Sequence, residues 1–385
     1  MAKSILILLF IFFIGNSFQK ADVYFTQYIT KSNMVKMFKK LNVKLTGKIG
    51  LKVHSGEVGG KYFLSPDFLQ KIHDYTKGTF IECNTAYQGG RYTTEAHKQL
   101  LKDHGWLKNG RRTIIMDENP SNDFNLTIEN PEIINRTIVG GRLKEFDSCI
   151  VLSHFKGHPM GGFGGALKQL SIGFASKAGK EWIHAAGNLT AKASQEDFTA
   201  SMGDAASSLV KYFRDRGGIV FINVLANISL WCDCAGGSAP APKIHDIGIL
   251  ASTDPVALDR ACLDMIENHT DVGTEELLGQ IERLVGENTI FVAERHKIGS
   301  QEYNFINITN ETDQYDIDDE NDDNDEKEGG ESSSNTWIII LIFAVIIMIA
   351  LAILVFYFYK TKNNPKNIDL IEKKVELETG AIKEE

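Results

Sequence analysis

Short extended segments alternate with amphipathic helices over residues 30–305, and this alternation constrains the fold more than any other feature of the sequence. The predicted helices are 33–40, 65–75, 94–104, 198–214 and 255–267. The predicted strands are 47–53, 79–83, 112–116, 148–153, 219–225 and 247–251. Strands that alternate with helices in this way usually pair in parallel through helical crossovers. We therefore predict an α/β domain, with a largely parallel sheet and helices on both faces.

Unusual polar segments follow five of the predicted strands. They begin at His54, Asn84, His154, Asn227 and Ser252. In open α/β sheets, ligands bind beyond the carboxyl ends of the strands. We therefore predict one shared site, built from loops at the same edge of the sheet.

The segment after residues 148–153 carries the densest set of reactive side chains. It contains two histidines, two lysines and several glycines, including His154, Lys156, His158, Gly164, Gly165 and Lys168. Glycine lets the backbone approach a ligand closely, because it has no Cβ. We predict His54, His154 and His158 as acid–base or metal-binding residues. Lys168 is predicted to hold a carboxylate, a phosphate or a covalent adduct.

Other residues on the same loops are candidates for substrate binding. Lys61 and Arg91 each follow a Gly-Gly pair, an arrangement that suits anion binding. Asn84 and Asp254 also follow predicted strands, although Asp254 precedes a proline and equally suits an N-cap of the next helix. The glycine-rich loops match neither the dinucleotide fingerprint nor the Walker pattern.

Five cysteines are present, and two of them form a Cys232-Asp-Cys234 pair. The pair offers two soft ligands, with Cys83 as a candidate third. The single intervening residue departs from the usual zinc spacing of Cys-x2-4-Cys. A transition metal or an iron–sulfur cluster is one interpretation. A disulfide or free thiols in an oxidising compartment is the other.

The two ends of the chain predict a membrane protein that enters the secretory pathway. Residues 1–17 resemble a signal peptide, and 306–336 form an acidic segment that we expect to be a disordered stalk. Residues 337–359 contain no charged side chain and are long enough to span a bilayer. Lysines follow in the tail 360–385, which we expect to be cytoplasmic. This predicts a single-pass type I protein with its main domain, 22–305, in the lumen or outside the cell.

Charge and sequons fit that topology. The formal net charge of −9 comes largely from the stalk, and no basic patch suggests a nucleic acid partner. Asn-x-Ser/Thr sequons include Asn307 and Asn310 beside the stalk, where we expect glycans.

The motifs of the main domain resemble those of the domain of unknown function 362 family. The similar segments are His54-Ser-Gly-Glu-Val-Gly-Gly, Glu82 to Arg91, Ser153 to Gly173, Cys232-Asp-Cys234 and Asp246 to Asp259. The resemblance covers about residues 22–305. Family members are often iron–sulfur proteins with a ferredoxin module. This chain has no Cys-x2-Cys-x2-Cys run, so the resemblance does not extend to those clusters.

A fainter resemblance links the same loop to the lactate racemase family. Members of that family carry a histidine and, ten residues later, a lysine that holds a nickel pincer cofactor. His158 and Lys168 have this spacing, but the Gly-Gly pair between them sits one residue earlier than in that family.

Three functions fit these features. The first is a metal-dependent or acid–base enzyme acting on a small anionic substrate. In that enzyme His154 and His158 would move protons, Lys168 would hold the substrate or cofactor, and Arg91 with Lys61 would bind a carboxylate. The second is a membrane-tethered metal or iron–sulfur module without catalysis. The third is a receptor-like surface protein that has lost its activity.

Overall fold

The structure is a computed structural model that describes residues 20–311. The predicted signal peptide, membrane span and cytoplasmic tail lie outside the described residues, as does the stalk beyond Glu311. Within 20–311, no helix has the length and apolar character needed to cross a bilayer.

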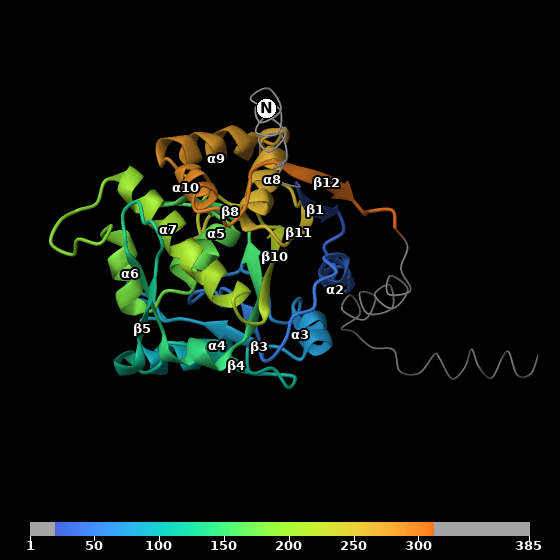
Figure 1. Ribbon diagram of the computed structural model, residues 1–385. Coiled ribbons are helices and arrows are strands. Elements are labelled where there is room, and N and C mark those ends of the chain that lie inside the picture. Colours follow the sequence, from blue (N-terminus) through green and yellow to red (C-terminus); the bar gives the residue numbers. More distant parts are fainter. Residues whose placement is uncertain (1–19, 312–385) are drawn as a thin grey trace, which may run out of the picture. The chain divides into compact units, whose positions relative to one another are not determined.

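An eight-stranded sheet forms the centre of the described domain (Figure 1). Its strands, in spatial order, are β12 (Tyr303–Asn307), β1 (Ala21–Thr26), β11 (Gly248–Ser252), β10 (Gly218–Leu225), β7 (Ser148–His154), β2 (Ile49–Lys52), β3 (Thr79–Glu82) and β4 (Thr113–Ile115). The five strands from β10 to β4 pair in parallel. The predicted α/β class with a largely parallel sheet is confirmed.

Side chains of the central strand β7 alternate between two hydrophobic cores. Cys149 and Val151 contribute to one core, and Ile150 and Leu152 contribute to the other. Since successive residues of a strand point to opposite faces, both faces of the sheet are buried. This pattern explains why the strand reads as an unbroken apolar run in the sequence.

Helices cover both faces of the sheet. The face that carries Val151 packs against α7 (Gln195–Arg214), α8 (Pro255–Glu267) and α10 (Asn288–Arg295). The opposite face packs against α2 (Lys31–Lys40), α3 (Gln70–Thr76) and α4 (Thr94–Asp103). In Figure 1, α7 and α2 lie on opposite sides of β10. The remaining helices are α6 (Lys177–His184) and α9 (Val272–Arg283).

Side-chain caps explain where several helices begin. Thr30 accepts from the backbone N–H of Asn33 at the start of α2, and Ser194 accepts from that of Asp197 at the start of α7. Such caps satisfy N–H groups that have no partner within the helix.

Two short hairpins and one irregular helix complete the domain. The hairpins are β5 (Phe124–Thr127) with β6 (Arg136–Val139), and β8 (Lys156–His158) with β9 (Gly162–Gly164). After β9 comes a single helical turn, α5 (Ala166–Lys168), which continues as the π-helical turn η3 (Gln169–Gly173). Turns of the π type are frequent at functional sites.

The prediction that five polar segments share one edge of the sheet is wrong for β11. This strand is antiparallel to both β10 and β1, so its carboxyl end lies at the opposite edge. Asp254 follows β11 and caps α8, accepting from the N–H groups of Val256 and Ala257. The N-cap interpretation of Asp254 is therefore correct, and the residue does not join the histidines.

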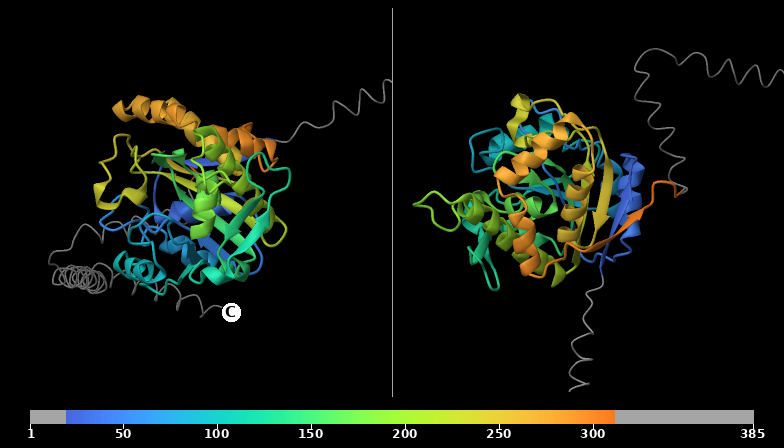
Figure 2. Two further views of the ribbon diagram at one scale, coloured as in Figure 1. Left: turned by 90° about the vertical axis from the view of Figure 1, so that its left-hand side faces the viewer. Right: turned by 90° about the horizontal axis from the view of Figure 1, so that it is seen from above.

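The ordered domain also extends past the predicted boundary at residue 305. Strand β12 runs to Asn307 and pairs in parallel with β1 at an edge of the sheet (Figure 2). Ile308 is buried in the core beyond it. The described domain therefore includes the first residues of the segment predicted as stalk.

Candidate functional site

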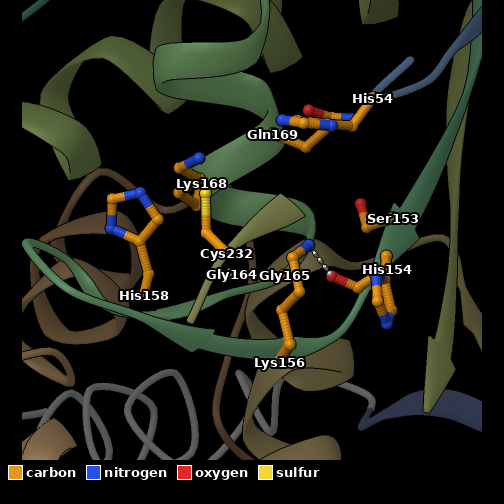
Figure 3. Close-up of a pocket in the computed structure, with 10 residues that line it drawn as sticks. All are labelled: His54, Ser153, His154, Lys156, His158, Gly164, Gly165, Lys168, Gln169 and Cys232. Carbon is orange, nitrogen blue, oxygen red and sulfur yellow. Dashed lines mark hydrogen bonds between the residues drawn. The ribbon is translucent and has the colours of Figure 1, made fainter. Parts of the chain in front are cut away.

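Loops at the carboxyl ends of β2, β7 and β10 enclose a polar pocket (Figure 3). It is lined by His54, Ser153, His154, Lys156, His158, Gly164, Gly165, Lys168, Gln169 and Cys232. A second cavity of about 140 Å³ adjoins it and adds Glu82, Tyr87, Arg91, Lys180, His184 and Cys234, among others. Four residues line both spaces, namely His54, His158, Lys168 and Gln169. The two spaces therefore form one candidate site.

A buried carboxylate, Asp233, organises one wall of the pocket. It lies on the turn η4 (Asp233–Ser238) after β10 and accepts from His154 Nδ1 at 3.0 Å. Lys156 Nζ lies 2.9 Å from the same carboxylate. Burial alone would raise the pKa of Asp233, but His154 and Lys156 hold it well below its ordinary value. Asp233 is therefore an anion that balances the charge of its neighbours.

His154 has no nitrogen free for a substrate. Its Nδ1 faces Asp233, and its Nε2 lies 2.6 Å from the carbonyl oxygen of Ala226. Both partners only accept hydrogen bonds, so the ring donates from both nitrogens. The structure gives His154 a positioning role, which differs from the proton transfer expected from the sequence.

His54 lies next to two donors, and in its neutral form it can accept a hydrogen bond from only one of them, because its other ring nitrogen carries a proton. Arg91 Nη2 lies 3.2 Å from its Nε2, and the backbone N–H of Gly56 lies 3.2 Å from its Nδ1. Burial, reinforced by the charge of Arg91, holds the pKa of His54 well below its ordinary value. His54 is therefore a neutral residue on the pocket wall.

Arg91 is anchored by groups on two loops. Its Nη2 donates to Tyr87 Oη at 2.7 Å, and its guanidinium lies 3.5 Å from Glu57 and 3.6 Å from Glu82. Glu57 also accepts from the N–H of Gly90, which fixes the glycine-bearing loop against it. The position of Arg91 is thus set before any ligand binds.

His158 presents one free ring nitrogen. Its Nδ1 accepts from the backbone N–H groups of Gly161 at 2.9 Å and Met160 at 3.3 Å. The Nε2 atom has no hydrogen-bond partner among residues 20–311. Burial, together with the charge of Lys168, lowers the pKa of His158 well below its ordinary value. The neutral ring therefore carries its proton on Nε2 and can donate it to a ligand in a hydrogen bond.

Lys168 is half-buried and lines both parts of the site. Within the described part of the chain its amine forms no hydrogen bond or ion pair. Burial, with the charges of Lys156 and Arg91, lowers the pKa of Lys168 to about 7. Asp233 opposes this shift only in part. Near neutral pH, a large fraction of this amine is uncharged and available for chemistry.

The turn that carries Lys168 is fixed by a second buried carboxylate, Asp259 on α8. Asp259 accepts from the N–H groups of Ala166 at 2.8 Å and Leu167 at 2.9 Å, and from Asn223 Nδ2 at 2.7 Å. A Cβ at Gly165 would lie 2.5 Å from Asp259 Oδ1, so only glycine allows this approach. Burial raises the pKa of Asp259 to about 6, against these hydrogen bonds.

Three buried polar atoms that line the two spaces lack a hydrogen-bond partner in the part of the chain that the structure describes. They are Ser153 Oγ, Arg91 Nε and His184 Nδ1. Buried polar atoms are rarely left unpaired, because the loss of hydration costs free energy. Ser153 lines the first space and Arg91 and His184 line the second, so a polar ligand or bound water in these adjoining spaces would complete their hydrogen bonds.

The cysteine pair lies at the same pocket. Cys232 and Cys234 are joined as a disulfide, which is the second interpretation left open by the sequence. Their sulfurs and a ring nitrogen of His158 all lie within 4.8 Å of one another, so the three residues form a candidate metal-binding group. Cys83 is not part of it, because its thiol is buried and donates to the carbonyl of Phe174.

The described residues do not fit an iron–sulfur cluster. Such clusters are usually held by four thiolates. Cys83, Cys149 and Cys262 are each buried, and none joins the candidate group. A single soft metal ion fits the group only when the disulfide is reduced, since thiolates are the ligands.

Two other predicted residues lie outside the site. Lys61 is exposed and lines a separate small pocket beside Trp231. Asn84 is buried in a hydrogen-bond network with His97, Thr94 and Asp117. Gly164 and Gly165 do line the pocket, as predicted from the sequence.

Sequence reasoning missed several residues of the site. They include Asp233, Asp259, Ser153, Gln169, Lys180 and His184. Asp233 was the easiest to find, because it lies between the two cysteines already singled out.

These features define an α/β domain with a ligand pocket at the carboxyl edge of a mostly parallel sheet. The chain belongs to the family described as Domain of unknown function (DUF362), whose family model matches residues 49–264. The family resemblance drawn from the motifs is thereby confirmed. No match is found among curated proteins.

Two solved structures share a distant likeness with the chain. A protein from Thermotoga maritima is 13% identical with a TM-score of 0.34, over 69% of this chain and 58% of that one. The lactate racemase apoprotein from Thermoanaerobacterium thermosaccharolyticum is 15% identical with a TM-score of 0.33, over 53% of this chain and 50% of that one. This chain therefore covers less than two thirds of the length of each solved structure.

The anchoring role of Asp259 predicts a large loss of stability in Asp259→Ala. The variant leaves three buried N–H donors without an acceptor, and each such group costs about 1–3 kcal/mol. We expect the free energy of unfolding, measured by urea denaturation, to fall by about 3 kcal/mol or more.

Asp215→Ala is the matched control. Asp215 is exposed and pairs only with Lys211 on the surface, so its removal should cost about 0–1 kcal/mol. Equal losses in the two variants would contradict the anchoring role of Asp259.

Proposed function

We propose that the domain is an enzyme that carries out acid–base chemistry on a small anionic substrate with a carbonyl or carboxylate group. In this proposal Lys168 supplies the reactive amine, and His158 donates a hydrogen bond from Nε2 to the substrate oxygen. The single observation that supports it most is that the Lys168 amine and His158 Nε2, neither of which has a hydrogen-bond partner within residues 20–311, line one pocket.

The electrostatics of the pocket support an anionic substrate. Lys156, Arg91 and Lys180 all act on Lys168 in the direction that lowers its pKa, and Asp233 acts against them. Three cationic side chains and one carboxylate thus act on the amine. A substrate carboxylate that enters this region is attracted by the same charges.

The neutral state of His158 supports a role as a hydrogen-bond donor. A neutral imidazole can polarise a carbonyl group without giving up its proton, provided that its geometry is fixed beforehand. The two backbone N–H groups at Nδ1 fix the ring in this orientation. His54 and His154 have both ring nitrogens engaged, so neither supports the same role as well.

Deuterium exchange tests the proposal. The full-length protein is incubated in D2O with pyruvate, 2-oxobutyrate or acetoacetate, and proton NMR follows the loss of protons next to the carbonyl. We expect faster exchange with the native chain for at least one compound. Lys168→Met should lower the rate by about 10²-fold or more. His158→Gln should lower it by about 10²-fold, because the oxygen loses its donor.

Lys192→Met is the control, since Lys192 is exposed and lies outside the pocket. This variant should exchange at the native rate. If no compound exchanges faster with the native chain than with Lys168→Met, the proposed acid–base function is wrong.

A second candidate function is metal binding by the reduced protein. The candidate group of His158, Cys232 and Cys234 supports it, and the disulfide opposes it in the oxidised state. We expect the oxidised protein to hold no stoichiometric zinc. After reduction with a phosphine and anaerobic dialysis against zinc, elemental analysis should find one ion per chain. Cys232→Ser should abolish loading, whereas equal loading of the native chain and Cys232→Ser would contradict this site.

We also propose, from the sequence, that residues 337–359 anchor the protein as a single-pass type I membrane protein. The main domain would then face the lumen or the outside of the cell. The Cys232–Cys234 disulfide supports this orientation, because disulfides persist in oxidising compartments.

A further inference from the structure

We propose that Lys168 binds the carbonyl carbon of its substrate covalently, as an imine, and that the substrate class is a small oxo acid. This inference rests on the proposed function and specifies how the amine acts. It follows from three observations: the hydrogen-bond partners of the lysines around the pocket, the rigidity of the turn that bears Lys168, and the size and polarity of the cavity.

The lysines near the pocket differ in whether the amine has a hydrogen-bond or ion-pair partner. Lys52 donates to the carbonyl of Val53 and lies 3.3 Å from Glu82. Lys156 donates to the carbonyl of His154 and pairs with Asp233, and Lys180 donates to the carbonyl of Ala175. Over residues 20–311, Lys168 has no such partner. Its amine is the one in this set that is free to react.

The amine is presented from a rigid support. Lys168 ends the single turn α5, whose first N–H groups bind the buried carboxylate of Asp259. The turn continues into η3 without a break, which fixes the backbone on both sides of the lysine. Covalent catalysis gains from such preorganisation, because the nucleophile does not have to be ordered in the transition state.

The environment also favours a nucleophile. The lowered pKa of Lys168, about 7, leaves a free amine at neutral pH. Free amines, and not ammonium groups, attack carbonyl carbons.

The cavity fits a short oxo acid. Its volume is about 140 Å³, and a cavity of about 150 Å³ in another protein holds one benzene molecule. A three- or four-carbon oxo acid has a similar number of heavy atoms. Arg91 Nε lies 3.5 Å from Glu57 but forms no hydrogen bond within residues 20–311, so it offers a donor for the carboxylate. His158 Nε2 offers a donor for the carbonyl oxygen.

The chemical step balances without a further reactant. The lone pair of Lys168 Nζ forms the C–N bond as the C=O π bond opens onto the oxygen, which His158 stabilises by its hydrogen bond. The two protons of the amine pass to that oxygen, which leaves as water when the C=N bond forms. The product is an imine of Lys168 and one water molecule, with no change in oxidation state.

Reductive trapping tests the inference. The full-length protein is incubated with glyoxylate or pyruvate and sodium cyanoborohydride, and the modified lysines are mapped by tandem mass spectrometry. We expect the reduced adduct at Lys168 to exceed that at the exposed Lys192 by at least about tenfold, because the pKa of Lys168 is lowered to about 7 and its amine lines the pocket that would hold the oxo acid. Lys168→Arg keeps a positive charge but cannot form the imine, so it should lose this adduct. Lys192→Arg should retain it.

Lactate provides a non-covalent comparison, because it has a carboxylate but no carbonyl. It should reduce the labelling of Lys168 without forming an adduct. An adduct spread evenly over exposed lysines, with none enriched at Lys168, overturns the covalent step. If deuterium exchange persists in that case, Lys168 acts as a base and the proposed function stands. If exchange is also absent, both proposals fall.

Discussion

The buried carboxylate of Asp233 is the interaction on which the rest of the site depends. It lies beyond β10 but binds His154 at the end of β7 and Lys156 in the hairpin that follows. These contacts join the loops of two neighbouring parallel strands. They also pair a buried carboxylate with two buried donors, and leaving any of these groups unpaired would be costly in a low-dielectric interior.

The contacts of Asp233 also determine which side chains of the pocket have no protein partner and can bind a ligand. Asp233 and the carbonyl of Ala226 occupy both nitrogens of His154, and Asp233 and a backbone carbonyl occupy Lys156. Glu57 and Glu82 lie close to Arg91. Lys168 has no hydrogen bond or ion pair among the described residues, and burial, together with the charges of Lys156 and Arg91, lowers its pKa. The reactivity assigned to Lys168 is thus a consequence of how its neighbours are paired.

Much of the fold could be predicted from local sequence patterns. The strands β2, β3, β7 and β10 are short apolar runs that end in polar loops, and their predicted and observed bounds agree within two residues. Strand direction could not be predicted in the same way. The apolar run of β11 has the same appearance as the parallel strands, although it is antiparallel to both neighbours. Direction depends on the connection between strands, which here contains the short 3-10 turn η4 and no α-helix.

The sequence predicts which residues line the site, but it does not predict what each of them does there. His54, His154, His158 and Lys168 do meet at one pocket, but His154 is tied at both nitrogens by Asp233 and Ala226. These partners are 79 and 72 positions away in the sequence, and Asp259 lies 93 positions from the turn that it anchors. No local pattern carries such information, because it arises only when the chain folds.

The pKa of Lys168 tests the central claim most directly. Full-length protein labelled with ¹³C at the lysine Cε atoms would be titrated by NMR, and Lys168→Arg would identify the signal. The account predicts a midpoint of about 7 for this amine. A midpoint near the ordinary value of 10.5 would contradict it, because an amine that remains charged at neutral pH cannot be the reactive group of the site.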